Sequence, residues 1–261
     1  MTCCFISVVS SESSSHLGRL DYASLTQQAL MEMAIAGITT NKERLCGNAM
    51  EPSLILEWDG VTLNDSQEVV EIRWLYYALK GSFFLQWLPS TVEKLMIGNN
   101  KLSGEITLDS LPESMKFLYL AQNSFSYEID LSHLPNKIEV LNVAANRLSG
   151  TLNFESLPAS IFKLFVSYNK FHGTVNLSQL PRNLTVLSLS KNSLSGTLDM
   201  RNLPPNIQRL WLAENKFSGS TDFSKLPASL VKLDVSKTSV SGRIDGRSGL
   251  SCLCRDSEVT I

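Results

Sequence analysis

A unit of 23 residues recurs without insertion or deletion through roughly two thirds of the chain. Leu-Pro pairs mark its copies, and they begin at Leu88, Leu111, Leu134, Leu157, Leu180, Leu203 and Leu226. An asparagine keeps the same step at Asn100, Asn123, Asn146, Asn169, Asn192 and Asn215, and Thr238 takes the next position. Seven copies in strict phase predict stacked, near-identical units, because a fixed period of about 20–50 residues is the signature of a solenoid.

Each copy contains a Leu-x-Leu pattern, which is typical of a strand with one buried face. The first leucines are Leu95, Leu118, Leu141, Leu164, Leu187, Leu210 and Leu233, and a second hydrophobic residue follows each of them two positions later. Side chains two residues apart point to the same face of a strand. One unit cannot bury that face alone, so we expect equivalent leucines to stack in a continuous core.

The asparagines and glycines of the unit predict tight turns. A short amide side chain can bond backbone groups that a buried turn leaves unpaired, so stacked asparagines would form a ladder. Glycine supplies a conformation that a side chain resists, and it recurs at Gly104, Gly150, Gly173, Gly196, Gly219 and Gly242. Tyr127 holds this position in one interior copy and predicts a local distortion there.

This pattern resembles the leucine-rich repeat family, whose core consensus is L-x-x-L-x-L-x-x-N-x-L. Segments such as Leu148-Ser-Gly-Thr-Leu152 and Leu194-Ser-Gly-Thr-Leu198 resemble the plant-type subclass, marked by L-x-G-x-I. The resemblance implies an α/β repeat solenoid, a horseshoe or superhelix with a parallel β-sheet on its concave face and an N-terminal helical cap. In that subclass a second short strand follows the glycine.

One more copy can be read upstream of the regular repeats, with Tyr77 in place of the ladder asparagine. Its in-phase residues are Val69, Ile72, Trp74, Leu79, Gly81, Phe83 and Leu85. Terminal repeats are atypical because they must cover the end of the core. We therefore expect a disordered segment 1–20, a helical cap 21–68, eight coils of 23 residues over 69–245, the first degenerate, and a tail 246–261.

The segment before the repeats resembles the end of a plant-type N-terminal cap. The family pattern is C-x-W-x-G-V-x-C, and Trp58, Gly60 and Val61 match it. Leu56 and Leu63 stand at the two cysteine positions, which puts the family disulfide in doubt and suggests that leucines close the core by packing instead. Further upstream, apolar spacing predicts a helix from Tyr22 to Ala36, ended near Gly37. We expect it to pack on the first coil, the alternative being a partner ligand.

The two ends of the chain carry its five cysteines, Cys3, Cys4, Cys46, Cys252 and Cys254. An odd count with adjacent members predicts free thiols rather than a disulfide framework or a metal site. No apolar run is long enough for a transmembrane helix. The start of the chain makes a poor secretory signal, so the compartment is open, with an intracellular one slightly favoured. The tail either closes the last coil loosely or precedes a native cap.

Signals of catalysis or of nucleic-acid binding are missing from the sequence. The net charge is −2, without the basic excess that nucleic-acid binding requires. His16, His133 and His172 lie far apart, and no phosphate-binding loop, nucleophile elbow or zinc spacing occurs. Acids including Glu105, Glu113, Asp130 and Asp199 are interpreted as a solvated surface scattered over the repeat phases. We expect no enzyme activity, no cofactor and no metal.

The expected concave face consists of residues that alternate with the buried Leu-x-Leu pair. Tyr119, Phe165 and Trp211 recur there in every second coil, about 10 Å apart at roughly 4.8 Å per strand. A neighbouring column of small residues, from Gly98 to Ser236, leaves room for an incoming chain. Exposed aromatic rings with flanking cations are typical of interaction hot spots. The candidate binding residues are Met96, Phe117, Tyr119, Asn142, Lys163, Phe165, Arg209, Trp211 and Lys232.

These features favour a monomeric, non-enzymatic module that binds a protein or peptide on its concave face. Two alternatives remain open: the ectodomain of a secreted or membrane-attached receptor-like protein, and a repeat spacer without a specific ligand. The aromatic residues are also compatible with drift, because Leu102 and Phe125 begin a two-coil alternation that indicates duplication of 46-residue pairs. Sequons at Asn64, Asn176 and Asn183 do not decide between these readings.

Overall fold

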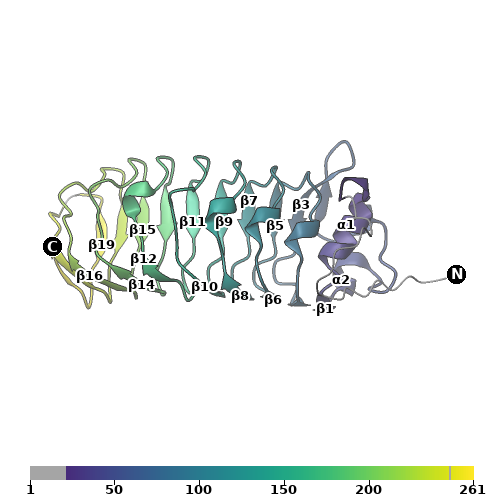
Figure 1. The fold of residues 1–261 in the computed structure, drawn as a ribbon, viewed down its shortest axis with the longest axis horizontal. Helices are drawn as coiled ribbons and strands as arrows, with labels where there is room; N and C mark the ends of the chain where they lie inside the picture. Colours follow the sequence, from purple (N-terminus) through teal and green to yellow (C-terminus); the bar gives the residue numbers. More distant parts are fainter. Residues whose placement is uncertain (1–21, 247) are drawn as a thin grey trace, which may run out of the picture.

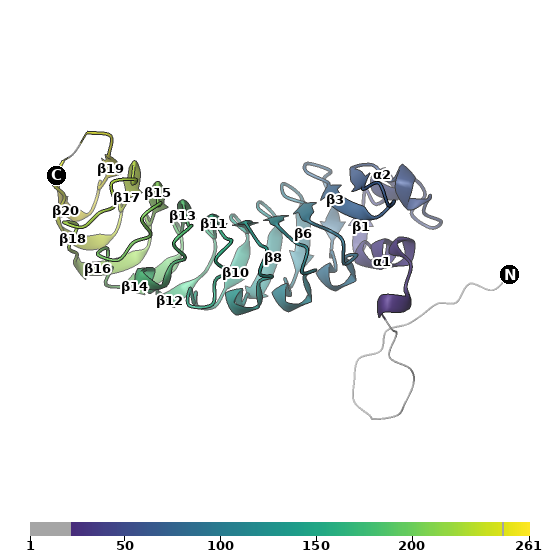
Figure 2. The same ribbon diagram turned by 90° about the horizontal axis from the view of Figure 1, so that it is seen from above.

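The computed structural model describes residues 22–246 and 248–261. The coils stack side by side into an elongated array, with the short helices of the N-terminal segment at one end (Figure 1). Seen from above, the array is a shallow arc, and the strands of its longest sheet line the inner side (Figure 2). The segment 1–20, expected to be disordered, lies outside the described residues.

A ten-stranded sheet runs the length of the array. All neighbouring strands are parallel except the first pair, β2 and β3, which are antiparallel. Equivalent leucines of the repeat face each other in register, Leu95 with Leu118 and Leu118 with Leu141. The predicted parallel sheet on the concave face is confirmed, and its strands are β2 (Val61–Leu63), β3 (Val69–Arg73), β5 (Lys94–Met96), β7 (Phe117–Tyr119), β9 (Val140–Asn142), β11 (Lys163–Phe165), β13 (Val186–Ser188), β15 (Arg209–Trp211), β17 (Lys232–Asp234) and β19 (Ser251–Leu253).

A second set of short strands runs beside this sheet, one strand in each coil. These strands contain or adjoin the repeat glycine, so the expectation that they follow it was wrong by several residues. They form two five-stranded sheets, made of β1 (Ile38–Thr40), β4 (Lys80–Gly81), β6 (Lys101–Gly104), β8 (Ser124–Glu128) and β10 (Arg147–Ser149), and of β12 (His172–Thr174), β14 (Ser193–Gly196), β16 (Lys216–Ser220), β18 (Ser239–Arg243) and β20 (Glu258–Thr260).

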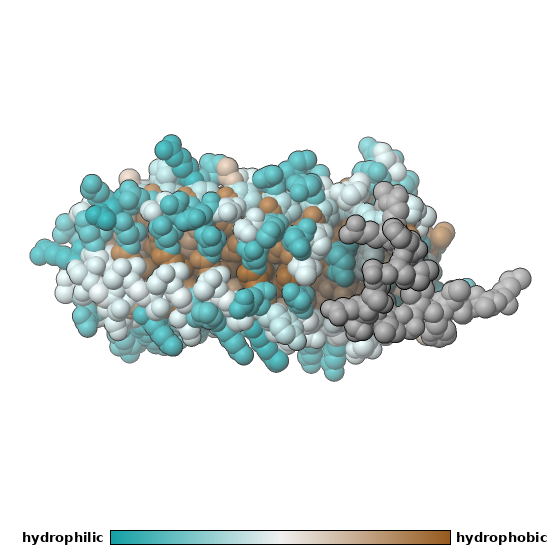
Figure 3. Space-filling model, in the orientation of Figure 1, coloured by the Kyte–Doolittle hydropathy of each residue, from teal (hydrophilic) through white to brown (hydrophobic). Residues whose placement is uncertain are grey.

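Short 3₁₀ helices connect several coils, each with a buried leucine at its start. They are η3 (Leu85–Trp87), η4 (Leu108–Ser110), η5 (Leu131–His133) and η6 (Leu177–Gln179). On the side of the array shown in Figure 3, apolar residues are visible as a band between hydrophilic margins. The core is therefore one continuous column of stacked side chains rather than a sphere, as expected for units that contact only their neighbours.

The N-terminal segment contains less helix than the sequence predicted. The helix expected from Tyr22 to Ala36 is a 3₁₀ turn, η1 (Tyr22–Ser24), followed by a separate helix α1 (Gln27–Ala34). The hydroxyl of Thr26 accepts a hydrogen bond from the amide of Ala29 and starts α1 at that point. Two further short elements follow, α2 (Glu43–Cys46) and η2 (Ile55–Glu57).

The two leucines at the cap cysteine positions do not act as a pair. Leu63 packs partly against the core, whereas Leu56 is 62% exposed, so the idea that both close the core was wrong. Trp58 covers the end of the core instead, since its ring is buried beside that of Trp74. Its indole N–H donates to the carbonyl of Ser53 and anchors the loop. The in-phase apolar side chains from Val69 to Leu85 are buried.

The asparagine ladder is confirmed by its hydrogen bonds. In a typical rung, Oδ1 of Asn146 accepts from the amide of Phe125 at 3.1 Å. Its Nδ2 donates to the carbonyls of Leu120, in the preceding coil, and of Val143, in its own coil. Each rung thus satisfies backbone groups of two coils that would otherwise be buried without partners.

Tyr127 does not distort its coil, contrary to the prediction. Its φ of 75° lies in the same left-handed region as the φ of the repeat glycines and is close to the 81° of Gly173. The register of its strand is the one that the other coils have: Leu148 faces Tyr127 as Leu194 faces Gly173. The tyrosine adopts glycine's backbone conformation and leaves its ring 65% exposed.

The tail 246–261 contributes one strand to each side of the array. β19 pairs with β17, and β20 pairs with β18, both in parallel. Cys252 faces Leu233 in the register, so the last strand has Cys-x-Cys where the repeat has Leu-x-Leu. Cys46, Cys252 and Cys254 are free thiols, as predicted, while Cys3 and Cys4 lie outside the described residues.

Candidate functional site

All nine candidate binding residues lie on strands of the ten-stranded sheet. They come from β5, β7, β9, β11, β15 and β17, in the two positions beside the buried leucine. Arg209 is exposed and the other eight are half-buried, because side chains of adjacent strands shield one another. The structure brings all nine residues to one sheet.

Three aromatic rings form the most prominent feature of this face, which we call the aromatic ridge (Tyr119, Phe165 and Trp211). The rings occupy the middle row of the sheet on β7, β11 and β15. Asn142 and Ser188 fill the same row on the strands between them. The rings are therefore separated by small polar residues, and each keeps part of its surface open to a partner.

The charges of the concave face are balanced at one end and unbalanced at the other. Near the N-terminal end, Lys94 forms an ion pair with Glu71 at 3.0 Å. No ion pair in the described part of the chain includes Lys163, Arg209 or Lys232. Nζ of Lys163 lies 5.2 Å from the ring centroid of Phe162. These three cations are available to an incoming ligand.

A cavity of about 290 Å³ opens on the same sheet beside Trp211. Its lining includes Ser167, Ser188 and Ser190, with Tyr168, Lys191, Ala213, Glu214, Asp234 and Ser236 around them. Lys191 pairs with Glu214 at 3.5 Å and lies over the ring of Tyr168 at 4.2 Å. The small residues noted in the sequence thus form the floor of a hollow.

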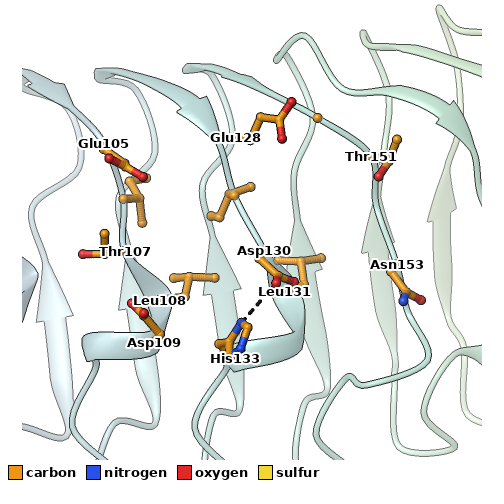
Figure 4. Close-up of a pocket in the computed structure, with 13 residues that line it drawn as sticks. Glu105, Thr107, Leu108, Asp109, Glu128, Asp130, Leu131, His133, Thr151 and Asn153 are labelled. Atoms are coloured by element: carbon orange, nitrogen blue, oxygen red, sulfur yellow. Dashed lines mark ion pairs between the residues drawn. The ribbon is translucent and has the colours of Figure 1, made fainter.

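A larger groove, of about 540 Å³, lies away from the aromatic ridge, between the strands of the second sheet and the 3₁₀ turns. Figure 4 shows Glu105, Glu128 and Asp109 around it, with Asp130 paired to His133. Nδ1 of His133 lies 3.0 Å from Oδ2 of Asp130. Hydrogen bonds from the backbone and hydroxyl of Ser132, together with the nearby His133, lower the pKa of Asp130.

Neither cavity contains a cluster of side chains, among the described residues, that could hold a metal ion. No group of three His, Cys, Asp or Glu side chains within the described residues is arranged to hold a metal ion. Burial raises the pKa of Cys252 to about 11, so its thiol is protonated at neutral pH and is a poor nucleophile. No helix in the described ranges could span a membrane.

Sequence reasoning missed a second column of polar residues, the outer Asx column (Asp130, Asn153, Asn176, Asp199 and Asp222). In each, Oδ1 accepts a hydrogen bond from the amide two residues later, as Asp199 does from Arg201 at 3.0 Å. Asp130 and Asp199 are three whole periods apart, so their description as acids scattered over the phases was wrong. A 23-residue search restricted to Asp and Asn would have found the column.

No family model and no curated protein matches the sequence. Solved structures do match the fold. The PEPR1–AtPEP1 crystal structure aligns with a TM-score of 0.58 and 22% identity over 89% of this chain and 41% of that chain. The structure of the Arabidopsis receptor kinase HAESA, in complex with the peptide hormone IDA and the co-receptor SERK1, aligns with a TM-score of 0.53 and 22% identity. The alignment covers 84% of this chain and 46% of that chain.

A third structure shows how different the functions of similar folds can be. A plant ice-binding protein aligns with a TM-score of 0.56 and 18% identity, over 90% of this chain and 94% of its own. The chain spans less than half the length of the PEPR1 and HAESA chains. These likenesses establish a plant-type leucine-rich repeat fold, which hosts more than one function.

Proposed function

We propose that this chain, whose fold is that of plant-type leucine-rich repeat ectodomains, is a non-enzymatic module that binds a protein or peptide on its concave face. The aromatic ridge is the observation that carries this proposal. Its three rings are half-buried, evenly spaced and fixed on strands, so little conformational entropy is lost when a partner covers them.

The surroundings of the ridge support the same function. Small residues beside it, such as Ala121 and Ser167, let an extended chain approach the sheet. The unpaired cations Lys163, Arg209 and Lys232 supply polar contacts at the margin, where charges guide encounter and register. Aromatic residues and arginine are enriched in the energetic centres of protein interfaces.

The comparisons favour a peptide or protein ligand without assigning one. HAESA is described with a peptide hormone and a co-receptor, and PEPR1 with AtPEP1. A receptor-like ectodomain is therefore a form that this binding module could take within a longer protein. A spacer without a ligand is the alternative that the ridge disfavours, because three half-buried aromatic rings aligned on one face leave apolar surface in contact with water.

The test is an affinity capture with three baits from the source cell. The first bait is the wild-type chain, and the second carries Tyr119→Ser, Phe165→Ser and Trp211→Ser. The third carries Tyr127→Ser, which removes an exposed ring from the second sheet and leaves the ridge intact. Circular dichroism first establishes equal folding of all three.

We expect a partner that wild type and Tyr127→Ser retain and that the ridge variant loses by tenfold or more. Equal capture by all three baits would move the binding site away from the concave face, with the groove lined by Glu105 and Asp109 as the next surface to mutate. Capture by none of them would favour the spacer.

A further inference from the structure

We propose that the cavity beside Trp211 receives an arginine side chain of the partner. This inference rests on the proposed function, since it assigns the chemistry of one part of the ligand. The argument comes from three features of the cavity: hydroxyl groups on its floor, one carboxylate without a counter-ion, and an aromatic face between them.

The floor of the cavity contains serine hydroxyl groups. Ser167 and Ser188 are only 8% and 7% exposed, and both line the cavity. Among the hydroxyls that line the cavity, Oγ of Ser190 is buried without a hydrogen-bond partner in the described part of the chain. Buried polar groups are nearly always paired, so this unpaired hydroxyl beside a hollow indicates a polar occupant.

Asp234 is the one charged residue lining the cavity that no ion pair of the described residues balances. Lys191 and Glu214 form an ion pair at 3.5 Å, and Lys237 reaches the other oxygen of Glu214 at the same distance. Asp234 takes part in no ion pair of the described residues. Its Oδ1 accepts from the amide and hydroxyl of Ser236, which fixes the carboxylate in place and leaves Oδ2 available.

The sheet register places these groups on either side of the indole of Trp211. Ser188 faces Trp211 across β13 and β15, and Trp211 faces Asp234 across β15 and β17. The three side chains therefore stand in one row, roughly 4.8 Å apart. A flat cation stacked on the indole would reach the hydroxyl of Ser188 at one edge and the carboxylate of Asp234 at the other.

Arginine fits this row better than other side chains. Its guanidinium is planar, stacks on aromatic faces and presents five donors in a fork that matches a carboxylate. A lysine ammonium can pair with Asp234 but cannot stack flat on Trp211 and donate to both sides. An acidic side chain would be repelled by the carboxylate of Asp234. Arg209 and Lys232, on the same strands in the neighbouring row, favour an acidic residue elsewhere in the same ligand.

The experiment selects peptides from a random display library on the folded chain. We expect wild type to enrich peptides that contain arginine. A selected peptide is then resynthesised with citrulline, which keeps the shape of arginine without its charge. Binding is measured by calorimetry to wild type, to Asp234→Asn, and to Asp222→Asn as a matched control in the outer Asx column. Asparagine at 234 still accepts from Ser236 through its Oδ1, so the strand is kept.

We expect Asp234→Asn and the citrulline change each to weaken binding roughly tenfold, and the two together to cost little more than either alone. Asp222→Asn should leave the affinity unchanged. Additive losses, or none, overturn the arginine assignment. Peptides that need Tyr119 and Phe165 but contain no arginine overturn it too and leave the proposed function standing. If no peptide binds wild type in preference to a Tyr119→Ser, Phe165→Ser variant, both proposals fail.

Discussion

Two columns of polar side chains run along the array at the same 23-residue step, and they differ in the residue types that they contain. The inner column is the asparagine ladder, from Asn100 to Asn215, and it contains no aspartate. The outer Asx column mixes both residues, with Asp130 and Asn153 as its first two members. Both columns pair with backbone, but only the inner one lies over the core.

The difference follows from the bonds that each column makes. An inner rung both accepts from an amide and donates to carbonyls, so it needs the two ends of a carboxamide. An outer residue only accepts, and a carboxylate or an amide oxygen serves equally well there. Hydrogen-bond inventory, rather than the repeat itself, decides which residue types a position tolerates.

The largest effect should come from exchanging the residue types between the columns. We expect Asn146→Asp to lower the free energy of unfolding by about 3 kcal/mol, because an aspartate would lose the bonds that Nδ2 donates and point a charge at the carbonyls of Leu120, Val143 and Ala144. Asn153→Asp should change it by less than about 0.5 kcal/mol. Urea unfolding of both variants measures the contrast, and equal losses would break the comparison.

The glycine column, between the two Asx columns along each coil, tests a position governed by backbone shape and close packing rather than by hydrogen bonds. Gly196 has a φ of 88°, and a Cβ there would lie 2.8 Å from the Cγ2 of Thr174. We expect Gly196→Ala to cost about 2 kcal/mol. Tyr127→Gly, which relieves the same conformation in the odd coil, should stabilise by about 0.5–1 kcal/mol. Thermal unfolding of the two variants should move in opposite directions.

Thr238 offers a way to complete the inner column. Its hydroxyl donates to the carbonyl of Val235 but does not replace the amide that would reach back to the preceding coil. We expect Thr238→Asn to stabilise by about 1 kcal/mol by supplying an acceptor for the amide of Phe217 and a second donor. The unfolding midpoint in urea measures this gain, and a loss would mean that the last coil is too different in shape for a rung.

The smallest effect on stability should come from a change in the outer Asx column, and it should depend on pH. Hydrogen bonds from the side chain and backbone of Arg201 lower the pKa of Asp199 from 3.8 to about 2. Because the folded-state pKa is depressed, the stabilising contribution is present above about pH 4 and is lost as pH falls through about 2. Arg201→Gln should raise the Asp199 pKa, as carboxyl NMR titration would show, with little effect on stability at neutral pH.

The repeat predicted the parallel sheet and the ladder because these depend on residues that must recur to stack. It could not predict the left-handed residue before each rung, since that position holds six residue types in seven coils, at Asn99, Gln122, Ala145, Tyr168, Lys191, Glu214 and Lys237. Only backbone geometry marks it. Stacking of whole coils imposes the conformation against the preference of each side chain.

The ends were harder to read because they lack this periodicity. Leu56 occupies a cap position in the sequence yet points to solvent, while Trp58 fills the core beside it. The concave candidates were placed on one face because period-two alternation fixes direction. The cavity beside Trp211 was not foreseen, since its polar hydroxyls come from positions that read only as small residues.

The hydrogen bonds of the asparagine ladder also imply that the array unfolds from its ends, one coil after another. Each rung joins its own coil to the one before it and to no other, so a coil is held only by its neighbours. Thr238 makes only the bond within its own coil and lacks the bond to the coil before it. Fraying should therefore begin at the C-terminal coils and advance one coil at a time, with amide exchange slowest near the middle of the array.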